Sequence, residues 1–278
     1  MTVVGESNAR FELAIPDRGD AKVALAWGMA TDVGNVRSHN EDSLVAAGTI
    51  FAVADGMGGH SAGDVASAAV VSRLAELATG GFVQPESIVD ALRAATMDIS
   101  HALDEQELGV GTTVTGAAIT IHGGHPYWVV FNVGDSRLYL FEHNVLTQVT
   151  VDHSVVQELV TAGLITSVDA AHHPNSNVVT RAVGFNSEPV PDFWLLPVTS
   201  DSRVLVCSDG LTREVGEFDL RARLAARSGP QETAQALVED ALKAGGRDNV
   251  TAIVIDVIAG NVADGDDLLE LEDTAPSH

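Results

Sequence analysis

The sequence predicts an α+β sandwich. Segments rich in valine and isoleucine, which favour strands, occur in groups, and so do the segments with helical periodicity. Strict alternation of single strands and helices would instead indicate a doubly wound sheet. The chain has 278 residues, of which 45% are hydrophobic, so it can bury one sizeable core. We therefore expect one folded domain rather than a largely disordered chain.

The individual elements follow from residue content and periodicity. The predicted strands cover residues 23–29, 43–54, 112–122, 127–141, 204–208 and 251–258. The predicted helices cover residues 62–78, 85–107 and 230–245. The second helix carries an apolar stripe from Ile88 to Leu103. The third begins at Pro230, a favourable first-turn residue, and ends with Gly245 as its cap.

Three apolar segments run directly into an aspartate at a glycine-containing turn. IFAVADG ends with Asp55 and Gly56, VVFNVGDS contains Asp135, and VLVCSDG contains Asp209. Asp248, in GGRDNV, stands just before a further apolar run. Carboxylates brought to one sheet edge repel one another and resist desolvation unless a cation holds them. Mg²⁺ and Mn²⁺ prefer such oxygen ligands, so the pattern predicts a two-metal hydrolase.

An ordinary turn is the alternative reading of each aspartate. Asp bonds its own backbone and Gly supplies positive φ, so Asp-Gly pairs are common in turns. Four aspartates at strand boundaries, together with Arg37, Glu41 and Asp42 in GNVRSHNEDS, favour the metal site over four unrelated turns.

The order of these motifs resembles a known family. RSHNED at residues 37–42 is followed by DGMGGH at 55–60, GTT at 111–113, GDSR at 134–137, SDGL at 208–211 and GGRDN at 245–249. The series is similar to the metal-dependent protein phosphatases (the PPM, or type 2C, family), most of all their bacterial branch, over residues 22–257. The resemblance implies a four-layer α-β-β-α sandwich, with two packed β-sheets flanked by helices and a metal cleft at one end.

The resemblance also implies roles for single residues. Asp55 matches the carboxylate that bridges two catalytic metals, and the Gly56 carbonyl is a further ligand. Asp209 and Asp248 complete the pair of metal sites. Glu41 and Asp42 correspond to acidic residues that hold metal-bound waters.

Two further positions match the family. Asp135, with Asp209, corresponds to a place where bacterial members can hold a third, looser metal. Arg37 corresponds to the residue that grips the substrate phosphate, which suits its planar, bidentate fork. Two cations about 4 Å apart can share a bridging water and lower its pKa, and the resulting hydroxide attacks phosphorus in line. No covalent phosphoenzyme is required.

The other side chains near these motifs are not expected to act as nucleophile or general acid. Cys207 lies within an apolar strand and is predicted to be a small core residue rather than a nucleophile. Met57 stands where many eukaryotic relatives carry a histidine proposed as general acid, and a thioether cannot donate a proton. A metal-bound water or another side chain must then protonate the leaving group. For the nearby His39 and His60 we favour a structural role.

Residues 152–185 correspond to the flap beside the active site, which contacts substrate in bacterial members. His172, His173 and Pro174 could suggest a metal site, but adjacent histidines in a loop are usually only exposed. Arg181 is expected to tie the flap back to the acidic cleft.

The leading hypothesis is therefore a serine/threonine phosphoprotein phosphatase that uses Mn²⁺ or Mg²⁺ and opposes protein kinases. One alternative is a phosphatase specific for a phosphorylated anti-sigma-antagonist protein. Another is an inactive module that binds phosphopeptides, which loss of any metal aspartate would favour; all of them are present.

Composition limits the partners and the compartment. The net charge of −24 argues against binding to nucleic acid or to an anionic membrane. No run approaches the roughly 20 apolar residues that span a bilayer, and residues 1–20 lack the apolar core of a signal peptide. A single cysteine fits a reducing cytoplasm. We expect a cytoplasmic monomer with an N-terminal extension (1–20), a catalytic domain (21–258) and an acidic disordered tail (259–278).

Overall fold

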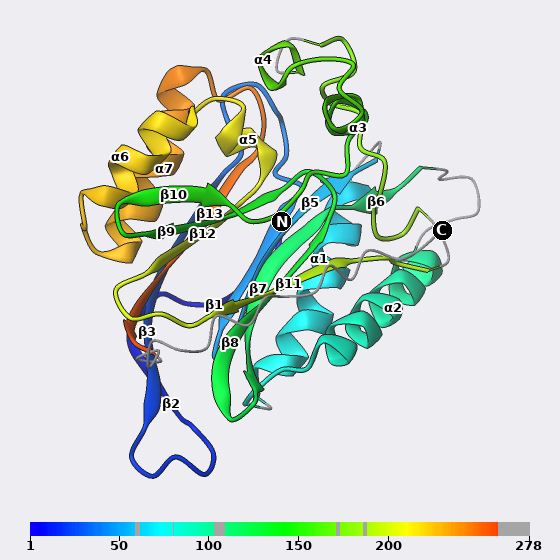
Figure 1. Cartoon of the computed structure of the whole chain (residues 1–278). Helices are drawn as coiled ribbons and strands as arrows, with labels where there is room; N and C mark the ends of the chain where they lie inside the picture. The colour runs from blue at the N-terminus through cyan, green and yellow to red at the C-terminus, as the bar shows by residue number, and fades with distance from the viewer. Residues whose placement is uncertain (59–61, 80, 103–108, 171–172, 186–187, 261–278) are drawn as a thin grey trace.

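Two β-sheets pack face to face and helices cover both outer faces, which confirms the predicted four-layer sandwich (Figure 1). The computed structural model describes residues 1–58, 62–79, 81–102, 109–170, 173–185 and 188–260. The predicted acidic tail beyond residue 260 lies outside the described residues, as do His60 and His172. None of the described helices is both long enough and apolar enough to cross a membrane.

The first sheet has the strand order β1-β4-β5-β7-β8-β11, with the short β6 also paired to β5. Its strands are β1 (Val3–Gly5), β4 (Asp42–Ala47), β5 (Ile50–Met57), β6 (Gly111–Thr112), β7 (Val114–His122), β8 (His125–Val133) and β11 (Asp192–Pro197). The neighbours are antiparallel except for the parallel pair of β1 and β4.

The second sheet has the order β10-β9-β12-β13-β3-β2, and all its neighbours are antiparallel. Its strands are β2 (Asn8–Ala14), β3 (Lys22–Asp32), β9 (Arg137–Glu142), β10 (Val145–Gln148), β12 (Arg203–Cys207) and β13 (Val250–Ala259). Because β12 ends just before Asp209 and β13 begins just after Asp248, this sheet shares in building the site.

Helices form the outer layers. The first sheet is covered by α1 (Ala62–Ala75), its short 3₁₀ continuation η1 (Glu76–Thr79) and α2 (Pro85–Ala102), and the second by α5 (Asp209–Thr212), α6 (Glu217–Ala225) and α7 (Pro230–Ala244). Figure 1 shows α3 (Val155–Thr161) and α4 (Ser167–Ala170) apart from these layers, at the top of the view. They belong to the segment that we predicted as a flap.

Three apolar layers hold the sandwich together. The middle layer lies between the sheets, where Trp27, Phe51 and Trp128 make successive edge-to-face contacts with ring centroids 5.1 and 6.1 Å apart. The other two layers lie between each sheet and its helices. Cys207 is fully buried in the layer under α5, α6 and α7, as predicted for a core residue.

The structure divides two segments that we predicted as single strands. Residues 43–54 form β4 and β5, which turn at Gly48 with a φ of +55°. Residues 127–141 form β8 and β9, which belong to different sheets and are separated by Gly134 with a φ of +116°. The strands on both sides of each turn are buried and therefore apolar, so the sequence shows one continuous apolar run that conceals the turn.

The N-terminal residues also differ from expectation. Residues 1–20, predicted to be an extension, supply β1 and β2 at the edges of the two sheets. The predicted helix 85–107 ends at Ala102 within the described part of the chain, and residues 103–107 lie outside it.

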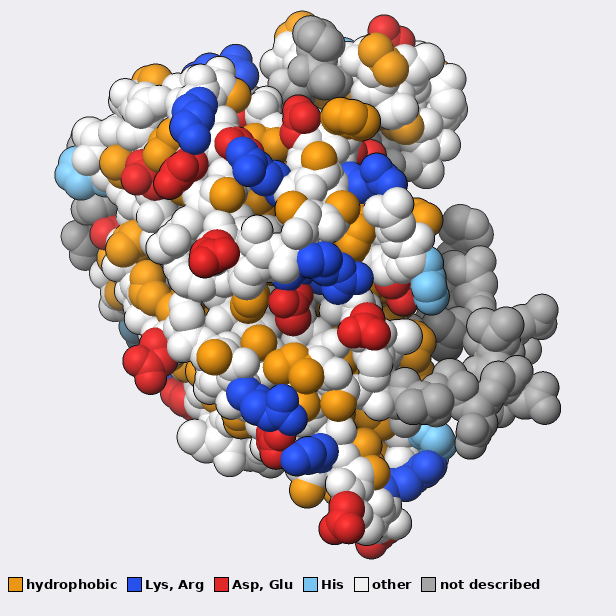
Figure 2. Space-filling view, turned by 90° about the vertical axis from the view of Figure 1, so that its left-hand side faces the viewer, with side chains coloured by type: hydrophobic (Ala, Val, Ile, Leu, Met, Phe, Trp, Pro, Cys, Tyr) orange, Lys and Arg blue, Asp and Glu red, His pale blue; other side chains and the backbone are white. Residues whose placement is uncertain are grey.

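Charges are interspersed on the face drawn in Figure 2, where basic and acidic side chains of the described residues lie close to one another. Ion pairs such as that between Arg223 and Asp240 fit this mixed pattern. The strongest concentration of carboxylates lies instead at one end of the sandwich.

Candidate metal centre

The five aspartates singled out by sequence or resemblance meet at one end of the sandwich. Asp42 opens β4 directly opposite Asp55 near the end of β5. Asp209 begins α5 just after β12, and Asp248 stands just before β13. Asp135 lies in the turn between β8 and β9. Asp55 interacts electrostatically with all four of the others, so both sheets contribute to one acidic cluster.

The GTT motif fixes Asp55 by its backbone. The Asp55 carbonyl accepts hydrogen bonds from the Thr113 N–H and the Thr112 hydroxyl, both at 2.9 Å. The Asp55 N–H in turn donates to the Thr113 hydroxyl at 3.1 Å. These bonds use only the backbone of Asp55, so its side chain interacts with the other carboxylates.

Gly56 is required by the close approach of α1. A Cβ on Gly56 would lie 2.1 Å from the carbonyl oxygen of Gly63, in the first turn of that helix. Any larger residue would therefore push α1 away from the site. The glycine after Asp55 has a packing role in addition to the ligand role implied by the resemblance.

Asp42 is buried and held from two sides. Its Oδ2 accepts hydrogen bonds from the Ser208 hydroxyl at 2.9 Å and from the Thr251 hydroxyl at 2.6 Å. Its Oδ1 has no hydrogen-bond partner. Burial raises the pKa of Asp42 to about 7.

Asn249 joins the first motif to the last. Its Oδ1 accepts the Glu41 N–H at 2.8 Å, and its Nδ2 donates to the carbonyls of Val33 and His39, both at 2.9 Å. The loop before β4 and the loop before β13 thus form one unit. This explains why an asparagine follows Asp248 in the sequence.

The acidic cluster is electrostatically unfavourable without a cation. Burial, followed by the neighbouring carboxylates, raises the pKa of Asp55 well above its usual range. Burial also raises the pKa values of Glu41 and Asp209, and it raises that of Asp135 to about 7. Oδ1 of Asp209, like that of Asp42, is buried without a partner. Unpartnered carboxylate oxygens in a crowded acidic cluster fit a site for hard divalent cations.

The cluster predicts an unusual pH dependence of stability. The ordinary pKa of these aspartates is 3.8, but folding raises it to about 7 for Asp42 and Asp135. The folded state therefore keeps protons that the unfolded state has lost, and stability falls as pH rises between these two values. In chelator, the melting temperature should decrease from about pH 5 to about pH 8, and saturating Mn²⁺ should reduce this decrease. A metal-free melting temperature that is constant or increases over this range would contradict the burial of the cluster.

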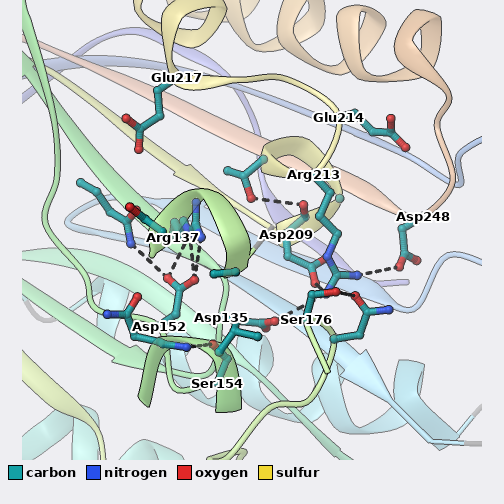
Figure 3. A pocket seen from close by; sticks show the side chains of 18 of the residues that line it. Asp135, Arg137, Asp152, Ser154, Ser176, Asp209, Arg213, Glu214, Glu217 and Asp248 are labelled. Atoms are coloured by element: carbon teal, nitrogen blue, oxygen red, sulfur yellow. Dashed lines mark hydrogen bonds and ion pairs between the residues drawn. The ribbon is translucent and has the colours of Figure 1, made fainter. Parts of the chain in front are cut away.

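Two arginines contact the cluster. Arg37 donates to Oδ2 of Asp248 at 2.8 Å, and about half of its side chain remains exposed (52%). Arg213 lies among three carboxylates, as Figure 3 shows: it pairs closely with Asp209, and its nitrogens lie 3.6 Å from Oδ2 of Asp135 and 3.6 Å from Oδ2 of Asp248.

Sequence reasoning identified Arg37 but missed Arg213. Arg213 follows Asp209 by four residues, at the C-terminal end of α5, so the two side chains lie on one face of the helix. This spacing was the feature of the sequence that could have identified Arg213. Within the described part of the chain, no three acidic, histidine or cysteine side chains converge on one point at metal-ligand spacing. Arg37 and Arg213 instead pair with Asp248 and Asp209.

A pocket of about 740 Å³ opens beside the cluster. Its lining includes Arg37, Asp209 and Arg213, together with flap residues such as Gln157 and Ser176. The flap therefore lies next to the acidic residues, as the resemblance implied. The pocket gives a ligand access to the carboxylates from solvent.

Arg181 does not tie the flap to the acidic cluster. It donates to Oδ1 of Asp192, on β11, at 2.8 Å. Asp192 also contacts Nε2 of His153, at 3.0 Å. Since Asp192 lies on an edge strand next to the flap, it is the nearer partner for Arg181, and the predicted contact was wrong.

Cys207, His39 and His173 have structural surroundings rather than catalytic ones. Burial raises the pKa of the Cys207 thiol to about 12, which removes it as a nucleophile. Nδ1 of the exposed His39 contacts the hydroxyl of Ser38 at 2.9 Å. Nδ1 of His173 accepts the N–H of Asn175 at 3.1 Å, which is typical of a local turn.

The chain is similar to known phosphatases along most of its length. A family model described as Protein phosphatase 2C matches residues 36–244. Over 243 residues the chain is 36% identical to the serine/threonine phosphatase stp of Listeria monocytogenes, which covers 81% of this chain and 93% of the relative.

Solved structures give the same answer. The crystal structure of the Mycobacterium tuberculosis serine/threonine phosphatase PstP/Ppp matches with a TM-score of 0.78 at 35% identity, covering 85% of this chain and 100% of that one. The PstP catalytic domain in complex with 2 manganese ions matches with a TM-score of 0.75 at 36% identity, covering 85% and 99%. With its fold, the order of its motifs and its matched residues in agreement, the chain belongs to the protein phosphatase 2C family.

Proposed function

We propose that this chain is a metal-dependent serine/threonine protein phosphatase whose acidic cluster is the catalytic metal centre. One observation carries the proposal: aspartates from both sheets meet at one end of the sandwich, with buried oxygens unpartnered, beside an open pocket. Family membership and the phosphatase names of the relatives support the same reaction.

The donor set suits two Mn²⁺ or Mg²⁺ ions, because it consists of carboxylate and carbonyl oxygens. Asp55 would bridge the pair, with the Gly56 carbonyl, Asp209 and Asp248 completing it. When bound, the two cations lower the pKa of water and stabilise charge on the attacking and leaving oxygens. Glu41 and the firmly held Asp42 would position water around the pair.

Arg37 would bind the phosphate of the substrate. It lies at the pocket, about half exposed, and one of its nitrogens contacts Asp248. Once Asp248 is engaged by a cation, the planar guanidinium is free to donate two parallel hydrogen bonds to phosphate oxygens.

The substrates would be phosphorylated proteins, so that the enzyme opposes serine/threonine kinases. We place the phosphatase domain at residues 21–258, joined by the edge strands from residues 1–20, with 152–185 as flap and 259–278 as acidic tail. The free thiol of Cys207 supports a reducing, cytoplasmic setting. We propose that the enzyme acts as a monomer and binds neither nucleic acid nor membrane, which its net charge of −24 supports.

Phosphate release from phosphothreonine and phosphoserine peptides tests the function. We expect turnover with Mn²⁺ or Mg²⁺ and none in chelator. A phosphotyrosine peptide provides the specificity control, and a phosphorylated anti-sigma-antagonist protein tests the narrower alternative. If that protein alone is dephosphorylated, the general protein-phosphatase assignment is wrong. If no phosphoprotein is hydrolysed and phosphopeptide still binds, the chain is a binding module.

A further inference from the structure

Arg213 lies where the family resemblance implies a third, looser cation. That place is defined by Asp135 and Asp209, and Arg213 contacts both. Burial raises the pKa of both Asp209 and Asp135, and Arg213 opposes this rise: its effect comes directly after that of burial for Asp209, and after those of burial and Asp209 for Asp135. The guanidinium therefore neutralises this part of the cluster.

The carboxylate of Asp209 has two differently engaged oxygens. Its Oδ2 pairs with Arg213, whereas its Oδ1 is buried and has no partner. Only 8% of Asp209 is exposed, so water does not readily supply the hydrogen bond that Oδ1 lacks. One oxygen is thus available for the catalytic pair, and the other is occupied by a cation that the chain itself supplies.

Arg213 and a divalent ion cannot share this place. Mg²⁺ binds carboxylate oxygens at about 2.1 Å. The nearer Arg213 nitrogen contacts Oδ2 of Asp209 and lies 3.6 Å from Oδ2 of Asp135. An ion bound to both oxygens would overlap this nitrogen, and the two positive charges would repel each other at close range.

Among the described residues, no other ion pair holds Arg213 away from the cluster. The adjacent acidic residue, Glu214, is engaged by Arg247 at 2.8 Å. The remaining carboxylate that Arg213 reaches is Asp248, at 3.6 Å, and Asp248 is already bonded to Arg37. Arg213 is half-buried, with 33% of its side chain exposed, so it is placed in the cluster rather than on the open surface.

We infer that Arg213 serves as a built-in substitute for the third cation, so that this chain binds the catalytic pair of metals but disfavours a third at Asp135 and Asp209. The inference rests on the proposed metal centre. Since Arg213 must leave before a third ion can bind, the guanidinium lowers the affinity for that ion while it stabilises the metal-free cluster.

Calorimetric titration with Mn²⁺ tests the inference without measuring activity. The parent should bind two ions. Arg213→Ala should gain a third binding event, or tighten a weak one by about ten-fold or more, because a neighbouring positive charge is removed. The gained event should disappear in Arg213→Ala combined with Asp135→Ala. Arg223→Ala provides the control, since Arg223 is a similarly exposed arginine paired with Asp240 outside the cluster.

Thermal unfolding gives a second readout. In chelator, Arg213→Ala should melt below the parent, because the aspartates lose their nearest cation. In excess Mn²⁺ it should gain more stability than the parent. Arg213→Lys keeps the charge and should remain near the parent in both experiments, which also covers the case in which the alanine variant folds poorly.

The outcomes separate the two proposals. Unchanged or weaker Mn²⁺ binding in Arg213→Ala, beside a parent that binds the pair, would overturn the role of Arg213 alone. A third ion that binds the parent as tightly as the variant would do the same. A parent that binds no Mn²⁺ would overturn the metal centre and this inference with it.

Discussion

Asp55→Asn should lower the rate of phosphate release at least about a thousand-fold, even with saturating Mn²⁺. The reason is that the charge stabilisation supplied by metal ions to the transition state is worth several kcal/mol. Asp55 is the carboxylate proposed to touch both cations, and it interacts with the four other aspartates. Removing one charge from a shared bridge weakens both metal sites together. The measurement is the initial rate on a phosphothreonine peptide over a range of Mn²⁺ concentrations.

The same substitution should raise the melting temperature in chelator. Its backbone hydrogen bonds to Thr112 and Thr113 are kept, and one like charge is removed from the cluster. Loss of activity with gain of metal-free stability distinguishes a functional residue from a structural one. Asp90→Asn, at an exposed position on α2, should change neither quantity. Near-normal turnover of Asp55→Asn would contradict the two-metal assignment.

Arg37→Ala should chiefly raise KM for phosphopeptides, with a smaller loss in kcat. Losing a charge-assisted hydrogen bond in a wet pocket costs about 1.5–3 kcal/mol, or roughly ten- to a hundred-fold in kcat/KM. Steady-state kinetics on a phosphopeptide and on a small aryl phosphate provide the measurement, because Arg37 should act on the phosphate that the two substrates share.

Two variants sharpen the role of Arg37. Arg37→Lys should recover only part of kcat/KM, since an ammonium cannot form two parallel bonds to phosphate. Arg93→Ala removes an arginine from α2, where it pairs with Glu188, and should leave the kinetics unchanged. If Arg37→Ala behaves like the parent on both substrates, Arg37 does not bind the phosphate.

The sequence identified the acidic residues because each stands within a short motif at one end of an apolar strand: Asp55 and Asp209 where a strand ends, and Asp42 and Asp248 where one begins. Strand boundaries alone therefore singled out Asp55, Asp209 and Asp248, although the structure shows that they come from two sheets rather than one. The groups that hold them could not be identified in this way, because their contacts cross the chain: Asn249 bonds to Glu41 across 208 residues, and Thr251 bonds to Asp42 across 209. Such pairings depend on the register of the two packed sheets.

The missed elements have local explanations. The edge strands β2 and β11 are only partly buried, so they lack the continuous apolar content of central strands. With four residues, α5 is too short to show helical periodicity, and this concealed the relation between Asp209 and Arg213. The turns at Gly48 and Gly134 lay within apolar runs, where a single glycine was weaker evidence than the surrounding valines.

Anomalous scattering from crystals grown with Mn²⁺ tests the central claim most directly, because it locates the ions independently of any reaction. We predict two strong peaks on either side of the Asp55 carboxylate, in contact with Asp209, Asp248 and the Gly56 carbonyl. Arg213 should remain against Asp209, with no peak of comparable height between Asp209 and Asp135. Mn²⁺ bound elsewhere, with the aspartate cluster still held only by arginines, would contradict the account.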